Sequence, residues 1–244
     1  MKKRWRIVSL IAIALGMHAV CFSQQFALAV TELQKIRDGY ADSGYSNFSV
    51  KYQYAKKSAP GKVLDTLTIQ YKMKGSDYYC KVDQIEFFQN DSINVAVYHK
   101  DKTIILSNPS LSTDKGRMAI DSWDSSFVAT YIDSVSISDN KNSRTLNIYF
   151  TDNAPYSSCT IVYNNKTYRT QKMSYVERSS EYLEEGSDKP EGIIITMYFS
   201  AVSKTPFDTS VFSEKKFITK QNDNWILGSA YKDYKLINNV YKYD

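Results

Sequence analysis

Few side chains in this sequence of 244 residues could carry out catalysis. Of its two histidines, His18 lies in the apolar leader described below, which leaves His99 as the remaining imidazole. A Ser-His-Asp or Cys-His arrangement would have to use His99, so a hydrolase predicts that His99→Ala abolishes an activity. The place of His99 at the end of the alternating run Ile93–Val97 instead predicts a partly buried residue at a strand end.

The carboxylates do not form a recognisable catalytic pair. The nearest pairs are Asp83 with Glu86 and Glu184 with Glu185, and such neighbouring charges are typical of solvated segments rather than of a glycosidase cleft. The sequence has no glycine-rich phosphate loop, no H-E-x-x-H and no G-x-S-x-G motif. One histidine is too few for a histidine-rich metal site. We therefore predict a protein that is not an enzyme and that binds no metal and no other cofactor.

Cys80 and Cys159 are the two cysteines beyond the leader, and both lie in strand-like segments. An even number of cysteines in an exported protein is consistent with a disulfide between them. Two buried free thiols fit the sequence equally well, so both alternatives stay open.

Residues 1–23 are organised like a secretory signal peptide. A cationic start is followed by the apolar run Ile7–Phe22 and then by Ser23, after which the chain becomes polar. The run is shorter than the roughly 18–20 residues that a retained membrane anchor needs. We predict cleavage after Ser23, export to the periplasm, and a single mature domain over residues 24–244. The alternative of lipidation at Cys21 would tether the protein to a membrane, although Val20 is not the usual small residue before a lipidated cysteine.

The net charge of +5 belongs mostly to the leader. Four of the 31 basic residues and none of the 26 acidic residues lie in residues 1–23, so the mature chain is close to neutral. A nucleic-acid-binding protein needs a clustered surplus of Lys and Arg, which is missing here. The 20 tyrosines instead suit broad sheet faces and binding grooves, because the ring packs while the hydroxyl stays hydrated.

The hydrophobic period predicts which elements the chain forms. Apolar residues at helical spacing predict one amphipathic helix over residues 26–40. A second helix is predicted from Met118 to about Ile132, with a strand from Val128 as the alternative. Alternating segments bounded by turn residues predict strands at 48–54, 67–73, 78–82, 85–88, 93–97, 103–106, 135–138, 146–151, 159–163, 168–176 and 193–199. Residues 211–218 and 225–227 are predicted to be helical or extended, and Leu236–Ile237 to join the sheet.

These elements predict an α+β fold that is mainly β. We expect a strongly curved antiparallel sheet, an incomplete barrel, whose concave face is covered by the N-terminal helix and one further helix. The strands present more apolar surface than two helices can cover, so the sheet either encloses an apolar cavity for an acyl chain or has a filled core. The residues predicted to line such a cavity are Leu33, Ile36, Leu67, Ile69, Tyr71, Met73, Ile93, Val95, Val97, Leu146, Ile148, Phe150, Ile195, Met197 and Phe199.

The order of elements resembles a known family. The segment Asp91–Tyr98 is similar to the turn-and-strand core of the LolA-like and LolB-like periplasmic carriers of outer-membrane lipoproteins, and Thr205–Phe212 resembles the Asp- and Phe-bearing segment after their last strand. Where those carriers have an Arg-Pro element, this chain has Lys72–Tyr79. The resemblance implies an incomplete barrel with helices as a lid over an apolar cavity.

Two functions follow from these observations. The first is a periplasmic carrier or binding protein for a lipid or for the acyl chains of a lipoprotein, which the apolar strand faces and the resemblance both favour. The second is a non-enzymatic interaction or scaffold protein of the cell envelope, as part of a secretion or surface assembly, with an envelope protein as its partner. In either case we expect a monomer that binds no nucleic acid.

Overall fold

The computed structural model describes residues 26–40, 44–109, 123–178, 192–222 and 224–240. The predicted signal peptide with Cys21, the first part of the second helix (residues 118–122), and the pair Glu184 and Glu185 lie outside the described residues. No helix among the described residues is long and apolar enough to cross a membrane.

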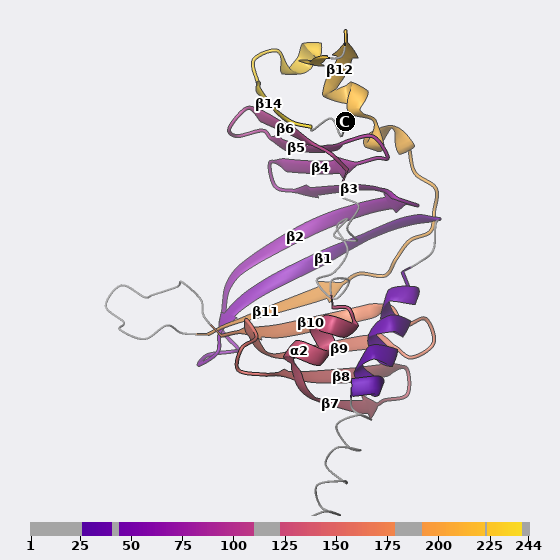
Figure 1. The fold of residues 1–244 in the computed structure, drawn as a ribbon, viewed down its shortest axis with the longest axis vertical. Coiled ribbons are helices and arrows are strands. Elements are labelled where there is room, and N and C mark those ends of the chain that lie inside the picture. The colour runs from indigo at the N-terminus through magenta and orange to yellow at the C-terminus, as the bar shows by residue number, and fades with distance from the viewer. Residues whose placement is uncertain (1–25, 41–43, 110–122, 179–191, 223, 241–244) are drawn as a thin grey trace, which may run out of the picture. The chain divides into compact units, whose positions relative to one another are not determined.

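Most of the described strands belong to one large, mostly antiparallel sheet, and the chain is mainly β with few helices, which confirms the predicted fold class (Figure 1). Their order is β14-β6-β5-β4-β3-β2-β1-β11-β10-β9-β8-β7, and β12 pairs with β13 in a separate hairpin. The chain divides into two compact units. Unit 1 holds the described parts of residues 1–40, 55–62 and 123–196, and unit 2 those of residues 41–54, 63–122 and 197–244. The prediction of one domain over residues 24–244 stays a prediction.

Unit 1 consists of helices packed on strands. Its elements are the N-terminal helix (residues 26–38), α2 (Ser125–Tyr131), β7 (Ile132–Asp139), β8 (Ser143–Phe150), β9 (Tyr156–Asn164) and β10 (Thr170–Glu177). The strands β1 (Tyr45–Lys56) and β11 (Ile193–Phe199) each contribute residues to both units.

The N-terminal helix forms because its apolar residues recur on one side. Ala29, Leu33 and Ile36 lie along one stripe of the helix and have no accessible surface, as a helix packed on a sheet requires. Figure 1 shows this helix and α2 over the strands β7–β10. The predicted helix over residues 26–40 is therefore confirmed, with its last helical residue at 38.

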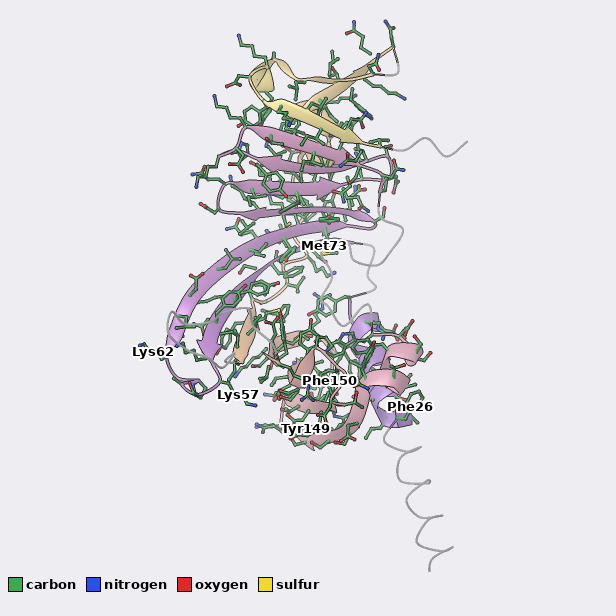
Figure 2. The ribbon with its side chains drawn as sticks, turned by 60° about the vertical axis from the view of Figure 1, so that its left-hand side comes forward. Phe26, Lys57, Lys62, Met73, Tyr149 and Phe150 are labelled. Atoms are coloured by element: carbon green, nitrogen blue, oxygen red, sulfur yellow. The ribbon has the colours of Figure 1, made fainter. Side chains whose placement is uncertain are left out.

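The helix α2 begins where the sequence supplies a cap. Asp124 is its N-cap, and the carboxylate accepts a hydrogen bond of 2.8 Å from the backbone nitrogen of Phe127. Trp123 stacks on Phe127, with ring centroids 5.3 Å apart, and meets Phe150 of β8 edge-on at 5.4 Å. Phe150 is buried whereas its neighbour Tyr149 is exposed, so alternate residues of β8 lie on opposite faces (Figure 2).

Unit 2 is a meander of strands with a folded C-terminal segment. Its strands are β2 (Val63–Lys74), β3 (Asp77–Val82), β4 (Ile85–Gln89), β5 (Asn94–Tyr98), β6 (Thr103–Ser107), β12 (Ile218–Gln221), β13 (Asn224–Leu227) and β14 (Lys235–Asn239). Three short 3-10 helices complete it: η2 (Thr209–Phe212), η3 (Glu214–Lys216) and η4 (Ser229–Tyr231). The strand β14 joins β6 in parallel, so the predicted addition of Leu236–Ile237 to the sheet is found at its edge.

Turns join the successive strands of unit 2, and the turn between β4 and β5 is hydrogen-bonded to the C-terminal segment. Lys57 and Lys62 lie at the turn before β2, and Met73 lies at the far end of that strand (Figure 2). At the β4–β5 turn, the Asn90 side-chain oxygen accepts hydrogen bonds from the backbone nitrogens of Ser92 and Ile93, which closes the turn. The Asn90 amide nitrogen then donates to the Phe212 carbonyl oxygen at 3.1 Å, and so holds the C-terminal segment beside the turn.

Candidate functional site

The pairing register of unit 2 assigns each side chain to one of two sheet faces. Residues directly opposite each other on neighbouring strands share a face, and adjacent residues of one strand do not. One face carries Phe88, Val95 and Leu106, which oppose one another across β4, β5 and β6. The other face carries Phe87, Ala96 and Ile105, one residue away on the same three strands. The two faces can therefore be compared strand by strand.

The first face is covered by the C-terminal segment, and we call it the covered face. Its core residues have no accessible surface: Phe88, Ile93, Val95, Val97, Ile104, Leu106, Phe217 and Ile218. Phe217, from the C-terminal segment, stacks on Phe88 of β4 with ring centroids 5.5 Å apart. Residues of β13, η4 and β14 pack against the same cluster, among them Trp225, Tyr231 and Leu236. Figure 1 shows this segment, coloured orange to yellow, beside β3–β6.

A buried carboxylate also lies on the covered face. Glu86 is 5% exposed and accepts hydrogen bonds of 3.1 Å each from Tyr79, His99 and Lys216. Burial favours the neutral carboxyl, but the hydrogen bonds from these three groups and the charge of Lys216 outweigh it and hold the pKa of Glu86 below its usual range. His99 contacts the Tyr234 hydroxyl at 3.0 Å through its other ring nitrogen. His99 thus joins Glu86 of β4 to the C-terminal segment.

The second face remains partly exposed, and we call it the open face. Two adjacent rows cross its strands. The first row runs through Val82, Ile85, Tyr98, Thr103 and Lys235, of which Lys235 is exposed and the others are half-exposed. The second row holds the half-exposed apolar side chains of Phe87, Ala96, Ile105 and Ile237. Cys80 precedes Phe87 in the second row and is nearly buried. Phe87 and Tyr98 meet edge-on, with ring centroids 6.2 Å apart. Half-exposed apolar side chains thus lie next to one another on this face.

A third row on the open face is polar. It runs through Tyr78, Gln89, Asn94, Ser107 and Asn239, which oppose one another on β3, β4, β5, β6 and β14. Tyr78 and Gln89 are buried, whereas Asn94 and Ser107 are half-exposed and Asn239 is exposed. The Asn94 side chain hydrogen-bonds the Tyr78 hydroxyl. The open face is therefore amphipathic, with apolar rows next to a row of uncharged hydrogen-bonding groups.

The residues predicted to line a cavity fall into three groups. Those without accessible surface are Leu33, Ile36, Ile93, Val95, Val97, Leu146 and Ile148. Those nearly buried are Tyr71, Phe150, Ile195 and Met197, and those half-exposed are Leu67, Ile69, Met73 and Phe199. The residues of the first group lie in the packed interior of the protein. A role in ligand binding stays a prediction for all of them.

Only part of the predicted set lies on the open face of unit 2. Tyr71 and Met73 oppose Cys80 and Tyr78 and so belong to it. The Phe48 ring of β1 stacks on Tyr71 at 5.2 Å, which explains why Tyr71 is nearly buried. In contrast, Val95 and Val97 lie on the covered face, where the C-terminal segment packs on them.

Sequence reasoning did not select the central residues of the open face, which include Phe87, Ala96, Tyr98 and Ile105. The signal for them was present, because β4 (IEFFQ) and β6 (TIILS) carry large apolar residues at consecutive positions. A strand that is apolar on both sides is expected to be covered on both sides. Alternation identifies one apolar side of each strand, and it does not select the apolar residues on the other side, such as Phe87 and Ile105.

The two cysteines and His99 are partly or fully buried. Cys80 of unit 2 and Cys159 of unit 1 are both buried, and a disulfide between them stays a prediction beside the alternative of two buried thiols. Burial raises the pKa of the Cys80 thiol to about 11 and that of Cys159 further. His99 is half-buried just after β5, as its position in the sequence predicted.

In unit 1 a second buried carboxylate fixes the N-terminal helix. Glu32 is 2% exposed and accepts hydrogen bonds from Lys35 at 2.7 Å, from Arg144 of β8 at 3.3 Å and from the Tyr163 hydroxyl of β9. Burial favours the neutral carboxyl, but the three donors together lower the pKa of Glu32. Since Glu32 belongs to the helix, this network joins the helix to two strands of unit 1.

A hollow of about 700 Å³ lies among η3, the β12–β13 hairpin and the end of β14. Its lining is mixed and includes Glu214, Lys215, Trp225 and Asn238. Charged and amide groups of this kind would lose hydration against an acyl chain. The open face, with its apolar rows, is the better candidate for an apolar ligand.

No protein-family profile and no curated protein matches the chain. Several solved structures are similar to it. A LolA superfamily protein from Nitrosomonas europaea is 12% identical, with 76% of this chain and 97% of that chain covered and a TM-score of 0.35. A putative outer membrane lipoprotein-sorting protein domain from Vibrio parahaemolyticus is 12% identical (75% and 96% covered, TM-score 0.33). The lipoprotein LppX of Mycobacterium tuberculosis is 11% identical (73% and 96% covered, TM-score 0.38).

Proposed function

We propose that the mature protein binds the acyl chain of a lipid or of an acylated protein on the open face of unit 2, and that it acts as a carrier or binding protein in the periplasm. The observation that carries this proposal is the difference between the two faces of the same strands. The covered face is closed by Phe217, Ile218 and their neighbours, while Phe87, Ile105 and Ile237 on the open face keep accessible surface.

The chemistry of the open face suits an acyl chain. Its second row, together with Val82, Ile85 and Tyr98 of the first, offers aliphatic and aromatic side chains, and each methylene buried against them contributes about 0.8 kcal/mol. Ten methylenes would contribute roughly 8 kcal/mol before the cost of association, which is of order 4 kcal/mol or more. The surplus corresponds to binding that is reversible, as a carrier requires.

The dimensions of the apolar rows favour a chain over a helix. Two rows two residues apart are separated by about 6.7 Å, and five strands from β3 to β14 span roughly 19 Å. A helix with its side chains is about 10–12 Å wide and would extend over the polar row. One extended acyl chain fits along the rows without covering Asn94 or Ser107.

A charge placed on the open face tests the proposal. We expect Ile105→Lys to abolish binding of a fluorescent acyl probe to the mature protein, because the ammonium group would have to be desolvated beneath the chain. Tyr149→Lys is the matched control, since Tyr149 is a 51% exposed strand residue of unit 1. Circular dichroism should show both variants folded. Undiminished probe binding by Ile105→Lys, or equal loss in Tyr149→Lys, would contradict the proposal.

A further inference from the structure

The strand β2 is longer than the strand β3 that pairs with it (Figure 1). The ladder between them covers Gln70–Lys74 of β2, and β3 ends at Val82, one residue beyond the partner of Gln70. On its other side β2 neighbours β1. Within the described parts of the chain, residues 63–68 of β2 therefore have no strand beside them on the side of β3, and we call these six residues the β2 edge.

The ladder also shows which backbone groups of the β2 edge point outward. Two residues separate the paired Lys74 and Asp77, so this pair exchanges both of its backbone hydrogen bonds, and every second pair along the ladder does the same. Continuing this alternation from Gln70, the N–H and C=O groups of Leu64, Thr66 and Thr68 are directed away from β1. The Thr66 N–H agrees with this direction, because it donates to the neighbouring Asp65 carboxylate at 2.7 Å.

The β2 edge lacks the features that usually keep a sheet edge from pairing. Such edges are commonly interrupted by lysine, proline or a bulge. The β2 edge reads Val-Leu-Asp-Thr-Leu-Thr and has Asp65 as its one charged residue. Val63 is 47% exposed and Leu64 is 48% exposed, although both are apolar strand formers. Exposed apolar residues on an unpaired strand are a template for a further strand.

We propose that the β2 edge binds an extended segment of another protein as an additional strand, antiparallel to β2 and in line with β3. The groups to be satisfied are backbone N–H and C=O groups that repeat every two residues, about 6.7 Å apart, and an extended peptide has the same repeat. A carbonyl oxygen of the incoming strand replaces the Asp65 carboxylate on the Thr66 N–H. This inference is independent of acyl binding on the open face.

The side chains of the β2 edge indicate which segment fits. Leu67 and Asp65 lie on one side of the strand, whereas Leu64, Thr66 and Thr68 lie on the other. Cross-strand neighbours are stabilising when apolar residues, opposite charges or threonines face each other. The segment therefore carries an apolar residue opposite Leu67 and, two residues later, a lysine or arginine opposite Asp65, with threonine or another β-branched residue between them.

A synthetic peptide with this pattern tests the proposal. The probe is the capped, fluorescently labelled hexapeptide Thr-Val-Thr-Lys-Thr-Val, whose third residue lies opposite Thr66 in the expected alignment. We would titrate it with the mature protein by fluorescence anisotropy and follow hydrogen exchange at saturating peptide. We expect slower exchange in fragments that cover residues 63–69 and unchanged exchange in β5 and β6.

Two matched pairs separate backbone pairing from other contacts. Thr66→Pro removes the outward N–H and should weaken binding at least tenfold, whereas Thr66→Ala keeps the N–H and should stay within about twofold. On the peptide, N-methylation of the third residue should weaken binding at least tenfold, and N-methylation of the fourth residue, whose N–H points away from β2, should not. The methylated peptides act on the unsubstituted protein, so this pair remains decisive where Thr66→Pro fails to fold.

Several results would overturn the inference. These are no peptide binding by the unsubstituted protein, equal effects of the two N-methylated peptides, full binding by folded Thr66→Pro, or protection outside residues 63–69. Dimerisation of the protein in place of peptide binding, seen by analytical ultracentrifugation and lost in Thr66→Pro, would identify a second copy of the chain as the occupant and would overturn the assignment to another protein.

Discussion

Phe87 and Phe88 offer a direct comparison of the two faces of unit 2, because they are neighbours on β4 with opposite surroundings. Phe88 has no accessible surface and stacks on Phe217 of the C-terminal segment. Phe87 is half-exposed and meets Tyr98 edge-on. The same substitution by alanine therefore removes a core ring at one position and a ring of the open face at the next.

The two substitutions are expected to lower the free energy of unfolding by amounts that differ several-fold. Phe88→Ala leaves a cavity beneath the C-terminal segment and should lower the free energy of unfolding by about 3–5 kcal/mol. Phe87→Ala removes a ring that is only half-buried, so roughly half of the usual burial energy, about 1 kcal/mol, should be lost. Binding of an acyl probe should show the reverse order among folded variants, with Phe87→Ala the more weakened.

Urea unfolding of both variants measures the loss in the free energy of unfolding. Because the chain has two compact units, hydrogen exchange of peptides from β4–β6 should be followed alongside, so that the unfolding of unit 2 is seen separately. Titration with the acyl probe in the absence of urea measures the loss in binding. Equal destabilisation by the two substitutions would refute the assignment of faces, and full probe binding by Phe87→Ala would refute its role.

Three further predictions concern buried polar groups. The pKa of Glu86 is lower in the folded chain than the unfolded value of about 4.3, so its contribution to stability is present above that pH and is lost as the pH falls through the lowered pKa. Urea unfolding from pH 7 down to pH 3 should show this loss, and Glu86→Gln, about 3 kcal/mol less stable at pH 7, should have a flatter profile; identical profiles would contradict it. Tyr163→Phe should speed hydrogen exchange in the N-terminal helix, because Glu32 loses a donor, and unchanged exchange would count against that network. Cys159 should react with iodoacetamide only after unfolding, since burial raises its thiol pKa; modification of the native protein, seen by mass spectrometry, would disprove this.

Local pattern was enough to predict the strands but not the surroundings of their faces. The alternation in β11 predicted residues 193–199, and the structure has that strand at Ile193–Phe199. In β5, however, alternation separates Val95 and Val97 from Ala96 and Tyr98 without showing which set is covered. That depends on Phe217 and Ile218, more than one hundred residues away, which fold onto the sheet through 3-10 turns and a short hairpin.

The buried carboxylate clusters lay beyond sequence reasoning for a similar reason. The sequence predicts that Glu86, near Asp83, is a solvated charge, and this prediction is wrong because Glu86 is only 5% exposed. Its partners Tyr79, His99 and Lys216 come from β3, from the end of β5 and from the C-terminal segment. No spacing in the sequence brings these residues together, because the sheet register and the path of the C-terminal segment do so.

The most direct test of the open face is to find where a bound chain lies. The mature protein would be incubated with a monoacylglycerol that carries a photoreactive diazirine in its chain, irradiated, digested and analysed by mass spectrometry. We expect labels on β4, β5, β6 and β14, at residues such as Phe87 and Ile105, and their loss in Ile105→Lys. Labels confined to the N-terminal helix and the strands of unit 1, or no labels at all, would contradict binding on this face.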